Sequence, residues 1–385
     1  MNRKELGLNM QTYLRSLCIA LAASLSFAAP AMAQDILVGH VAGYTGPVTK
    51  DSSEMGAGAQ VYFDSVNAHG GLLGRKIRLV VADDHFKPEQ TSELILSMNG
   101  KVSALLPPVG SAQLERAFKD GVFDKINLPV VGTIPATESF RVPVNRNIFH
   151  FRAGDNDQIE KIIDLLTSVG VTKIALLATS NTNGDQVAAF MTESLGKRKL
   201  KPATIQKYTI AAKIDFSGAI KGFEAATADA VVMIGPPFAT AQFVKDAKAA
   251  GLTAALYGLS YTDYRLVAKV AGTDAARGVA ISQVLPSPAR RTTPLIKEFR
   301  ENFEKYGKAQ TEPSFFNLEG YIAAKVIVEA IRRSKDASPN GVRRGLEELH
   351  NYNLGGYYVD FSPTKHTGSS FVDMSMIGAK GELIY

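Results

Sequence analysis

The sequence of 385 residues has a single cysteine and, beyond its first segment, no long apolar run. Cys18 lies in an N-terminal segment that we expect to be removed, so thiol catalysis and cysteine-ligated metals are excluded from the remaining chain. No later segment has the roughly eighteen consecutive apolar residues that a membrane-spanning helix needs. Lysine and arginine are spread along the chain and the net charge is only +6, so we do not expect nucleic acid as a partner.

Motifs for nucleotide binding and for nucleophilic catalysis are also missing. The glycines at positions 39, 43 and 46, within and just after the first apolar run, lack the G-x-G-x-x-G spacing, and no P-loop or G-x-S-x-G sequence occurs. Asp83-Asp84-His85 is the nearest candidate for a metal site, but adjacent side chains on an extended segment point in opposite directions, which favours a strand end and turn. We therefore expect no metal, no cofactor and no enzyme; an extracytoplasmic enzyme with dispersed carboxylates stays a lesser alternative.

The first 33 residues have the features of a secretory signal peptide. Basic residues at positions 3, 4 and 15 precede an apolar stretch over 17–29, and the small-x-small tripeptide Ala31-Met32-Ala33 favours cleavage before Gln34. A short buried helix of the fold is the alternative. The pattern predicts a free protein in the periplasm.

From Asp35 onward, short β-branched runs alternate with amphipathic helical stretches, which predicts βαβ units and mostly parallel sheets. The expected strands are apolar throughout, as in sheets covered on both faces, and they span 36–41, 77–82, 104–106, 129–132, 174–178, 230–234 and 278–282. Expected helices include 238–250, with one face formed by Phe238, Ala241, Val244 and Ala247. Another is 315–333, with core positions at Leu318, Tyr321, Ile322 and Ile331. The last thirty residues alternate apolar and polar residues like antiparallel strands.

Several segments carry a resemblance to a known family. Val38-Gly-His-Val-Ala-Gly-Tyr44-Thr-Gly46-Pro47 is followed by a helix ending in Asn67-Ala-His-Gly70-Gly71-Leu-Leu-Gly74-Arg75, and further matches are 108–111, 128–132, 149–152, 249–252 and 317–324. Over essentially the whole chain after the signal peptide, the sequence resembles the periplasmic solute-binding proteins of ABC transporters, of the branched-chain amino-acid type.

This resemblance implies a type I periplasmic binding fold. Two Rossmann-like α/β lobes with mostly parallel sheets flanked by helices would be joined by a three-segment hinge. We expect lobe 1 to comprise 34–152 and 283–368, and lobe 2 to comprise 153–282 and 369–385.

In the family, two loops of the first lobe grip the ligand carboxylate. The first loop corresponds to Gly110, Ser111 and Ala112, where a strand gives way to a helix whose first-turn N–H groups can bind an anion. A plain helix cap is the alternative role of Ser111. In the second loop the resemblance makes Thr133, Ala136 and Thr137 candidates, and Tyr44 is expected to line the cleft from the same lobe, a packing role being its alternative.

The second lobe departs from the amino-acid binders. Their ligand ammonium is neutralised by an acidic residue after the strand that follows Ala-Ala-Gly-Leu, but here Ser260 stands at that place, followed by Tyr261. Asn183 and Phe238 are at the positions of an aromatic residue that faces the ligand. Because an unpaired buried ammonium is costly, a carboxylate with an uncharged or aromatic remainder suits the site, unless Asp263 or Glu319 supplies the charge.

The resemblance thus implies a monomeric binding protein that closes its lobes around a small carboxylate-bearing solute and delivers it to a membrane ABC permease. A ligand-sensing receptor on the same fold is the alternative function.

Overall fold

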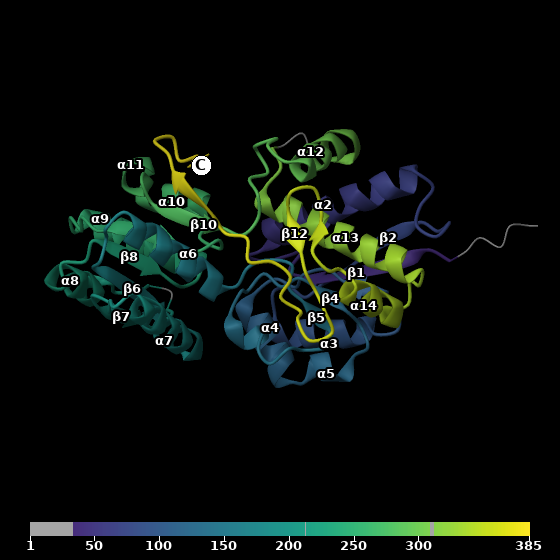
Figure 1. Ribbon diagram of the computed structural model, residues 1–385, viewed down its shortest axis with the longest axis horizontal. Helices are drawn as coiled ribbons and strands as arrows, with labels where there is room; N and C mark the ends of the chain where they lie inside the picture. The colour runs from purple at the N-terminus through teal and green to yellow at the C-terminus, as the bar shows by residue number, and fades with distance from the viewer. Residues whose placement is uncertain (1–33, 212, 309–311) are drawn as a thin grey trace, which may run out of the picture.

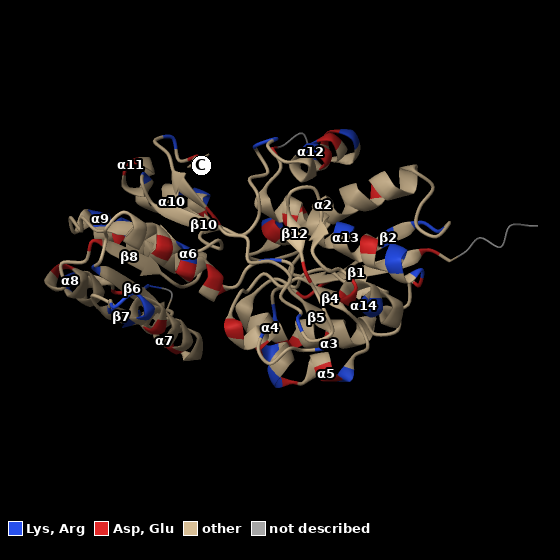
Figure 2. Ribbon diagram, in the orientation of Figure 1, with Lys and Arg blue, Asp and Glu red and all other residues tan. Residues whose placement is uncertain are grey.

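The computed structural model describes residues 34–211, 213–308 and 312–385 (Figure 1). The expected signal peptide and Cys18 lie outside these residues. Within them, no helix combines the length and apolar character needed to cross a membrane. Acidic and basic residues are interspersed along the helices and strands (Figure 2).

The first sheet is parallel, with strand order β2-β1-β3-β4-β5. Its strands are β1 (Ile36–Ala42), β2 (Ile77–Asp83), β3 (Ala104–Leu105), β4 (Val130–Val131) and β5 (Ile148–Phe149). Helices cover both faces, so we call this sheet and its helices the first lobe. One face packs on α2 (Thr49–Ala68), α12 (Pro294–Tyr306), α13 (Phe315–Ser334) and α14 (Pro339–Glu347), and the other on α3 (Pro88–Met98), α4 (Ser111–Lys119), α5 (Val122–Lys125) and the short helix η1 (Glu138–Phe140).

The second sheet has seven strands in the order β14-β13-β10-β9-β8-β6-β7. They are β6 (Ile174–Thr179), β7 (Ile205–Tyr208), β8 (Ala230–Met233), β9 (Ala255–Gly258), β10 (Ala280–Gln283), β13 (Asp373–Ile377) and β14 (Leu383–Ile384). The pairs β10–β13 and β13–β14 are antiparallel, and the other pairs are parallel. This sheet and its helices form the second lobe. One face packs on α6 (Asp155–Ser168) and α7 (Thr182–Lys197), and the other on α8 (Ser217–Ala225), α9 (Pro237–Ala249), α10 (Tyr264–Ala271) and α11 (Thr273–Ala276).

The chain passes between the two sheets three times, and the two lobes lie side by side (Figure 1). It crosses between β5 and α6, between β10 and α12, and after the small hairpin of β11 (Tyr352–Asn353) and β12 (Tyr358–Val359) on the way to β13. The Tyr357 hydroxyl donates to the carbonyls of Phe151, at 2.7 Å, and Val284, at 3.2 Å, and thereby ties the first two crossings together.

The expected α/β class with mostly parallel sheets is confirmed, and the expected core residues of α13 are fully buried. One residue of a predicted helix face differs from the prediction. Ala241 and Val244 of α9 are fully buried as predicted, but Phe238, the second residue of this helix, is 43% exposed. Strands β5 and β7 are not among the strands expected from the sequence. β5 has only two residues, and β7 is a partly polar strand at the edge of its sheet, so neither forms an apolar run.

Two glycines bring α2 and α13 into backbone contact. A methyl group at Gly58 would overlap the carbonyl of Asn317, and one at Gly320 would overlap the carbonyl of Met55. The Asn317 side-chain amide also donates to the Glu54 carbonyl at 2.6 Å. The close approach of these helices therefore depends on glycine at both positions.

We expect Gly320→Ala to lower the free energy of unfolding by about 1–3 kcal/mol, because the added methyl group pushes α13 away from α2. Gly196→Ala in α7 is the matched control: nothing lies within 4 Å of its added methyl group, so helix propensity alone acts and stability should rise by up to about 1 kcal/mol. Urea unfolding of both variants tests this, and a Gly320→Ala protein as stable as the parent would contradict it.

Candidate functional site

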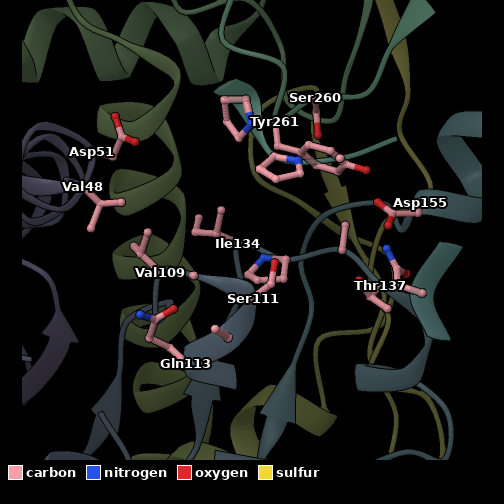
Figure 3. Close-up of a pocket in the computed structure, with 18 of the residues that line it drawn as sticks. Val48, Asp51, Val109, Ser111, Gln113, Ile134, Thr137, Asp155, Ser260 and Tyr261 are labelled. Carbon is pink, nitrogen blue, oxygen red and sulfur yellow. The ribbon is translucent and has the colours of Figure 1, made fainter. Parts of the chain in front are cut away.

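A cavity of about 470 Å³ lies between the lobes (Figure 3). Its walls are loops that follow the carboxyl ends of strands in both sheets, namely the loops after β1, β2, β3 and β4 of the first lobe and after β6, β7, β8, β9 and β10 of the second. In open α/β sheets this edge is where ligands bind, because the loops and helix N-termini converge there. The fold thus places a common site at the junction of the lobes.

The first-lobe wall contains the start of α4. Gly110, at φ 111°, leads into the helix, and a methyl group there would overlap the side chains of Gln113 and Phe86. Ser111 and Ala112 are exposed in the first turn, and Ala136 and Thr137 line the cavity just before η1. Helix N-H groups and hydroxyls on this wall form an arrangement that can bind a carboxylate.

Apolar side chains form a large part of the lining. Figure 3 shows Val48, Val109 and Ile134 together, on the side of the cavity opposite Asp155. The aromatic rings of Phe86, Phe315 and Phe316 extend the first-lobe wall, and Ile210, Pro236 and Pro237 belong to the second lobe. The site can therefore hold a solute with an apolar part as well as a polar end.

A buried arginine lies where the chain first crosses between the lobes. Arg152 Nη1 donates to Glu319 of α13 at 2.9 Å, and Nη2 donates to the Ser260 hydroxyl at 2.9 Å. Both charged side chains are about 5% exposed or less, and the Ser260 N–H donates to Gln158 at 2.8 Å. Ser260 is thus held by the hinge arginine.

Glu319 and Asp263 were the two residues that could supply the negative charge absent at Ser260, and they lie in different surroundings. Glu319 does line the cavity, but its charge is paired with Arg152. Burial raises the pKa of Glu319, and Arg152 opposes that rise. Asp263 caps α10 by accepting from the Arg265 N–H and is not part of the lining. Neither residue offers a free negative charge to a ligand.

Another carboxylate in the cavity had no motif to reveal it. Asp155, the first residue of α6, is 2% exposed, and its Oδ1 has no hydrogen-bond partner in the part of the chain that the structure describes. Burial raises its pKa to about 6, although Arg141 and Arg152 favour the charged form. Burial raises the pKa of Tyr261, and the negative charge of Asp155 raises it further.

Most of the candidate residues come together in this cavity: Gly110, Ser111, Ala112, Ala136, Thr137, Asn183, Ser260 and Tyr261 all line it. Three do not. Thr133 is fully buried and donates to the Pro135 carbonyl at 3.0 Å, and Tyr44 packs beneath the wall with its hydroxyl 2.8 Å from His40. Phe238 faces outward from α9.

The interpretation of Asp83-Asp84-His85 as a turn is confirmed. Asp83 accepts from the backbone N–H groups of Tyr44 and His85, and Asp84 accepts from Phe86 and from the Thr91 hydroxyl. These bonds fix the loop that presents Phe86 to the cavity. No group of three or more histidine, cysteine, aspartate or glutamate side chains is arranged for a metal within the described residues.

Known proteins share this architecture. The solved structures of an extracellular ligand-binding receptor from Verminephrobacter eiseniae and a substrate-binding periplasmic protein from Ralstonia solanacearum are 29% and 32% identical, with TM-scores of 0.81 and 0.79. Each comparison covers 91% of this chain and 99% or more of the other. A Leu/Ile/Val-binding protein homolog from Brucella melitensis is 25% identical over 86% of both chains.

The sequence match to the family described as "Periplasmic binding protein" spans residues 35–382, nearly all of the described chain. A branched-chain amino acid ABC transporter protein from Thermus thermophilus, solved with bound valine, has the same fold at 21% identity and a TM-score of 0.75. With its two α/β lobes and the cavity between their strand ends, the chain belongs to the periplasmic binding protein family of solute-binding proteins.

Proposed function

We propose that this protein is secreted into the periplasm through a cleavable signal peptide, captures a small carboxylate-bearing solute between its lobes and delivers it to an ABC permease. The cavity at the junction of both sheets is the observation that carries this proposal. Membership of a solute-binding family and the transporter named for the Thermus thermophilus protein support it. We infer that the solute is bound and released unchanged.

In this proposal the solute carboxylate lies against the first turn of α4. Ser111 offers its hydroxyl there, and the N-terminal dipole of a nine-residue helix favours a negative charge. Thr137 contributes from the neighbouring loop, and the valine, isoleucine and phenylalanine side chains surround the apolar part of the solute. A cavity of about 470 Å³ suits a molecule the size of an amino acid or an aromatic acid.

Closure of the lobes would bury this solute. The first two chain crossings line the cavity, at Arg152 and at 283–285, and Tyr357 holds them together. Rotation about the crossings brings Ser260 and Tyr261 toward Ser111. Water leaves the site as the walls meet, which strengthens the hydrogen bonds to the carboxylate. The closed pair of lobes is then the form that a permease recognises.

A thermal-shift screen tests the function directly. The protein is unfolded and refolded to remove retained solute, then mixed with amino acids, aromatic acids, dicarboxylates, amides and urea-like compounds. A solute present at 100 times its Kd adds about 2.7 kcal/mol of stability, which shifts Tm measurably. Stabilisation by one chemical class supports the proposal, whereas steady conversion of a stabilising compound would show an enzyme instead.

Ser111→Ala should weaken the binding of a carboxylate solute by about 1–3 kcal/mol, or roughly 5- to 150-fold, because one carboxylate oxygen loses its donor. Ser97→Ala is the control, since this exposed serine of α3 donates only to the Leu94 carbonyl and does not line the cavity. Titration calorimetry measures both variants, and an unchanged Kd for Ser111→Ala would remove Ser111 from the site.

A further inference from the structure

A buried arginine lies behind the 133–137 loop, the second of the two loops on the first-lobe wall. Arg141 directly follows η1 and is only 4% exposed. Its guanidinium donates to three backbone carbonyls, from Nε to Ala136 at 3.3 Å, from Nη1 to Arg152 at 3.1 Å and from Nη2 to Ala153 at 3.3 Å. One side chain therefore connects this loop to the first crossing between the lobes.

The acceptors of Arg141 explain why an arginine suits this position. All three are main-chain oxygens, so the bonds satisfy the donors without neutralising the charge. Burial lowers the pKa of Arg141 to about 10, and the charge of Asp155 opposes that fall, so the guanidinium is charged at pH 7. A buried charge is costly to keep, but only the planar fork of arginine donors reaches three separate carbonyls at once.

The end of the loop is also bonded to the start of the second lobe. The Asp155 N–H, in the first turn of α6, donates to the Ala136 carbonyl at 3.0 Å. A methyl group at Gly154 would lie 3.3 Å from Arg141 Nε and 3.5 Å from the Ala136 carbonyl oxygen, so glycine leaves room for this close approach. Ala136 is thus held where the crossing becomes α6.

The start of the same loop is fixed inside the first lobe. The buried Thr133 hydroxyl donates to the Pro135 carbonyl at 3.0 Å, and Nδ1 of His150 lies 3.0 Å from the same hydroxyl. These contacts involve neither the crossing nor the second lobe. They leave the end of the loop to be fixed by Arg141.

The end of the loop carries the groups that face the solute. Ala136 and Thr137 line the cavity, whereas Arg141 does not. Figure 3 shows Thr137 and Asp155 on the same side of the cavity, as the bond between the Asp155 N–H and the loop requires. A shift of the loop would therefore displace Thr137 from Ser111 and from a solute that contacts both.

We propose that Arg141 is a positioning residue for solute binding, because it holds the cavity-lining end of the 133–137 loop against the first crossing and so places Thr137 against the solute. This inference rests on the proposed function and adds to it a residue that does not touch the solute. Affinity should then depend on the shape of the arginine fork as well as on its charge.

Hydrogen exchange of the unliganded protein provides the first test. Arg141→Lys keeps the positive charge, but a single ammonium nitrogen cannot replace a fork that reaches three carbonyls. We expect amides of 134–141 and 153–156 to exchange at least about fivefold faster in the variant, with α2 and β8 unchanged. Equal exchange in both proteins would overturn the proposal, and so would faster exchange throughout the first lobe, which indicates a general loss of stability.

Affinity measured well below Tm separates positioning from stability. L-leucine and 3-phenylpropanoate are the probes for titration calorimetry. Arg141→Lys should raise the Kd of a bound probe about tenfold, as expected for one misplaced hydrogen-bonding group. An unchanged Kd together with a lower Tm would show a merely structural residue and overturn the proposal.

Arg343→Lys is the matched control for this substitution. Arg343 is a partly buried arginine of the first lobe that donates to the side-chain oxygens of Asn127 and Asn147 and does not line the cavity. Its replacement should change the Kd less than about twofold, even where it lowers Tm. An equal loss of affinity in both variants would contradict a specific role of Arg141.

A double-mutant cycle tests whether Arg141 acts through Thr137. Thr137→Ala should weaken a bound probe about fivefold or more in the parent protein but less than about twofold in the Arg141→Lys protein, because Thr137 is then already misplaced. Ser111→Ala, in the other loop, should have the same effect in both proteins. A Thr137→Ala effect that is equal in both, or absent from both, would overturn the proposal.

The two proposals can fail separately. Tight binding of a probe by the parent and by Arg141→Lys alike leaves the proposed function intact and removes Arg141 from it. Binding of neither probe by the parent counts against the proposed function, and the hydrogen-exchange comparison then decides whether Arg141 holds the loop.

Discussion

The Arg152–Glu319 ion pair is the interaction around which the site is built. Arg152 belongs to the first crossing between the lobes, Glu319 belongs to the long helix α13 of the first lobe, and Ser260 belongs to a cavity loop of the second. Two charges at about 5% exposure or less have lost most of their hydration, and only their mutual contact and well-placed hydrogen bonds offset that loss. The Arg152 guanidinium thus connects α13 of the first lobe to a cavity loop of the second.

Pairing within this cluster also decides which groups are left for a solute. Glu319 neutralises Arg152, and Arg152 engages the Ser260 hydroxyl, so the charged residues nearest the hinge are already bound to one another. Asp155 also lines the cavity, and its Oδ1 accepts no hydrogen bond from the described residues. The contacts that fix the hinge thus bind Arg152, Glu319 and Ser260 to one another but leave Oδ1 of Asp155 without a partner among the described residues.

The sequence was a good guide to the fold because local patterns and the fold agree. Apolar runs became buried parallel strands, and Leu318 and Tyr321 of α13 are in the core as their spacing predicts. Phe238 was misplaced because it lies in the first turn of α9, where helical spacing alone does not show whether a side chain reaches the core. Loop residues were harder still: Thr137 lines the cavity while Thr133, four positions earlier, is buried, and the turn between them has no periodic pattern to reveal this. Asp155 was missed because the lack of a partner is a tertiary property, set by residues that are distant in sequence.

The contact of α2 with α13 has a consequence for the order in which the protein folds. Asn317 donates to the Glu54 carbonyl across 263 positions of the chain, and strands β13 and β14 of the second sheet come even later. Neither lobe can cover its apolar surface until α13 and strands β13 and β14 have joined it. Contacts of such sequence separation slow folding and lengthen the time for which aggregation competes. A chain with this connectivity therefore exposes apolar surface for longer while it folds, for a reason inherent in its topology and independent of the solute that it binds.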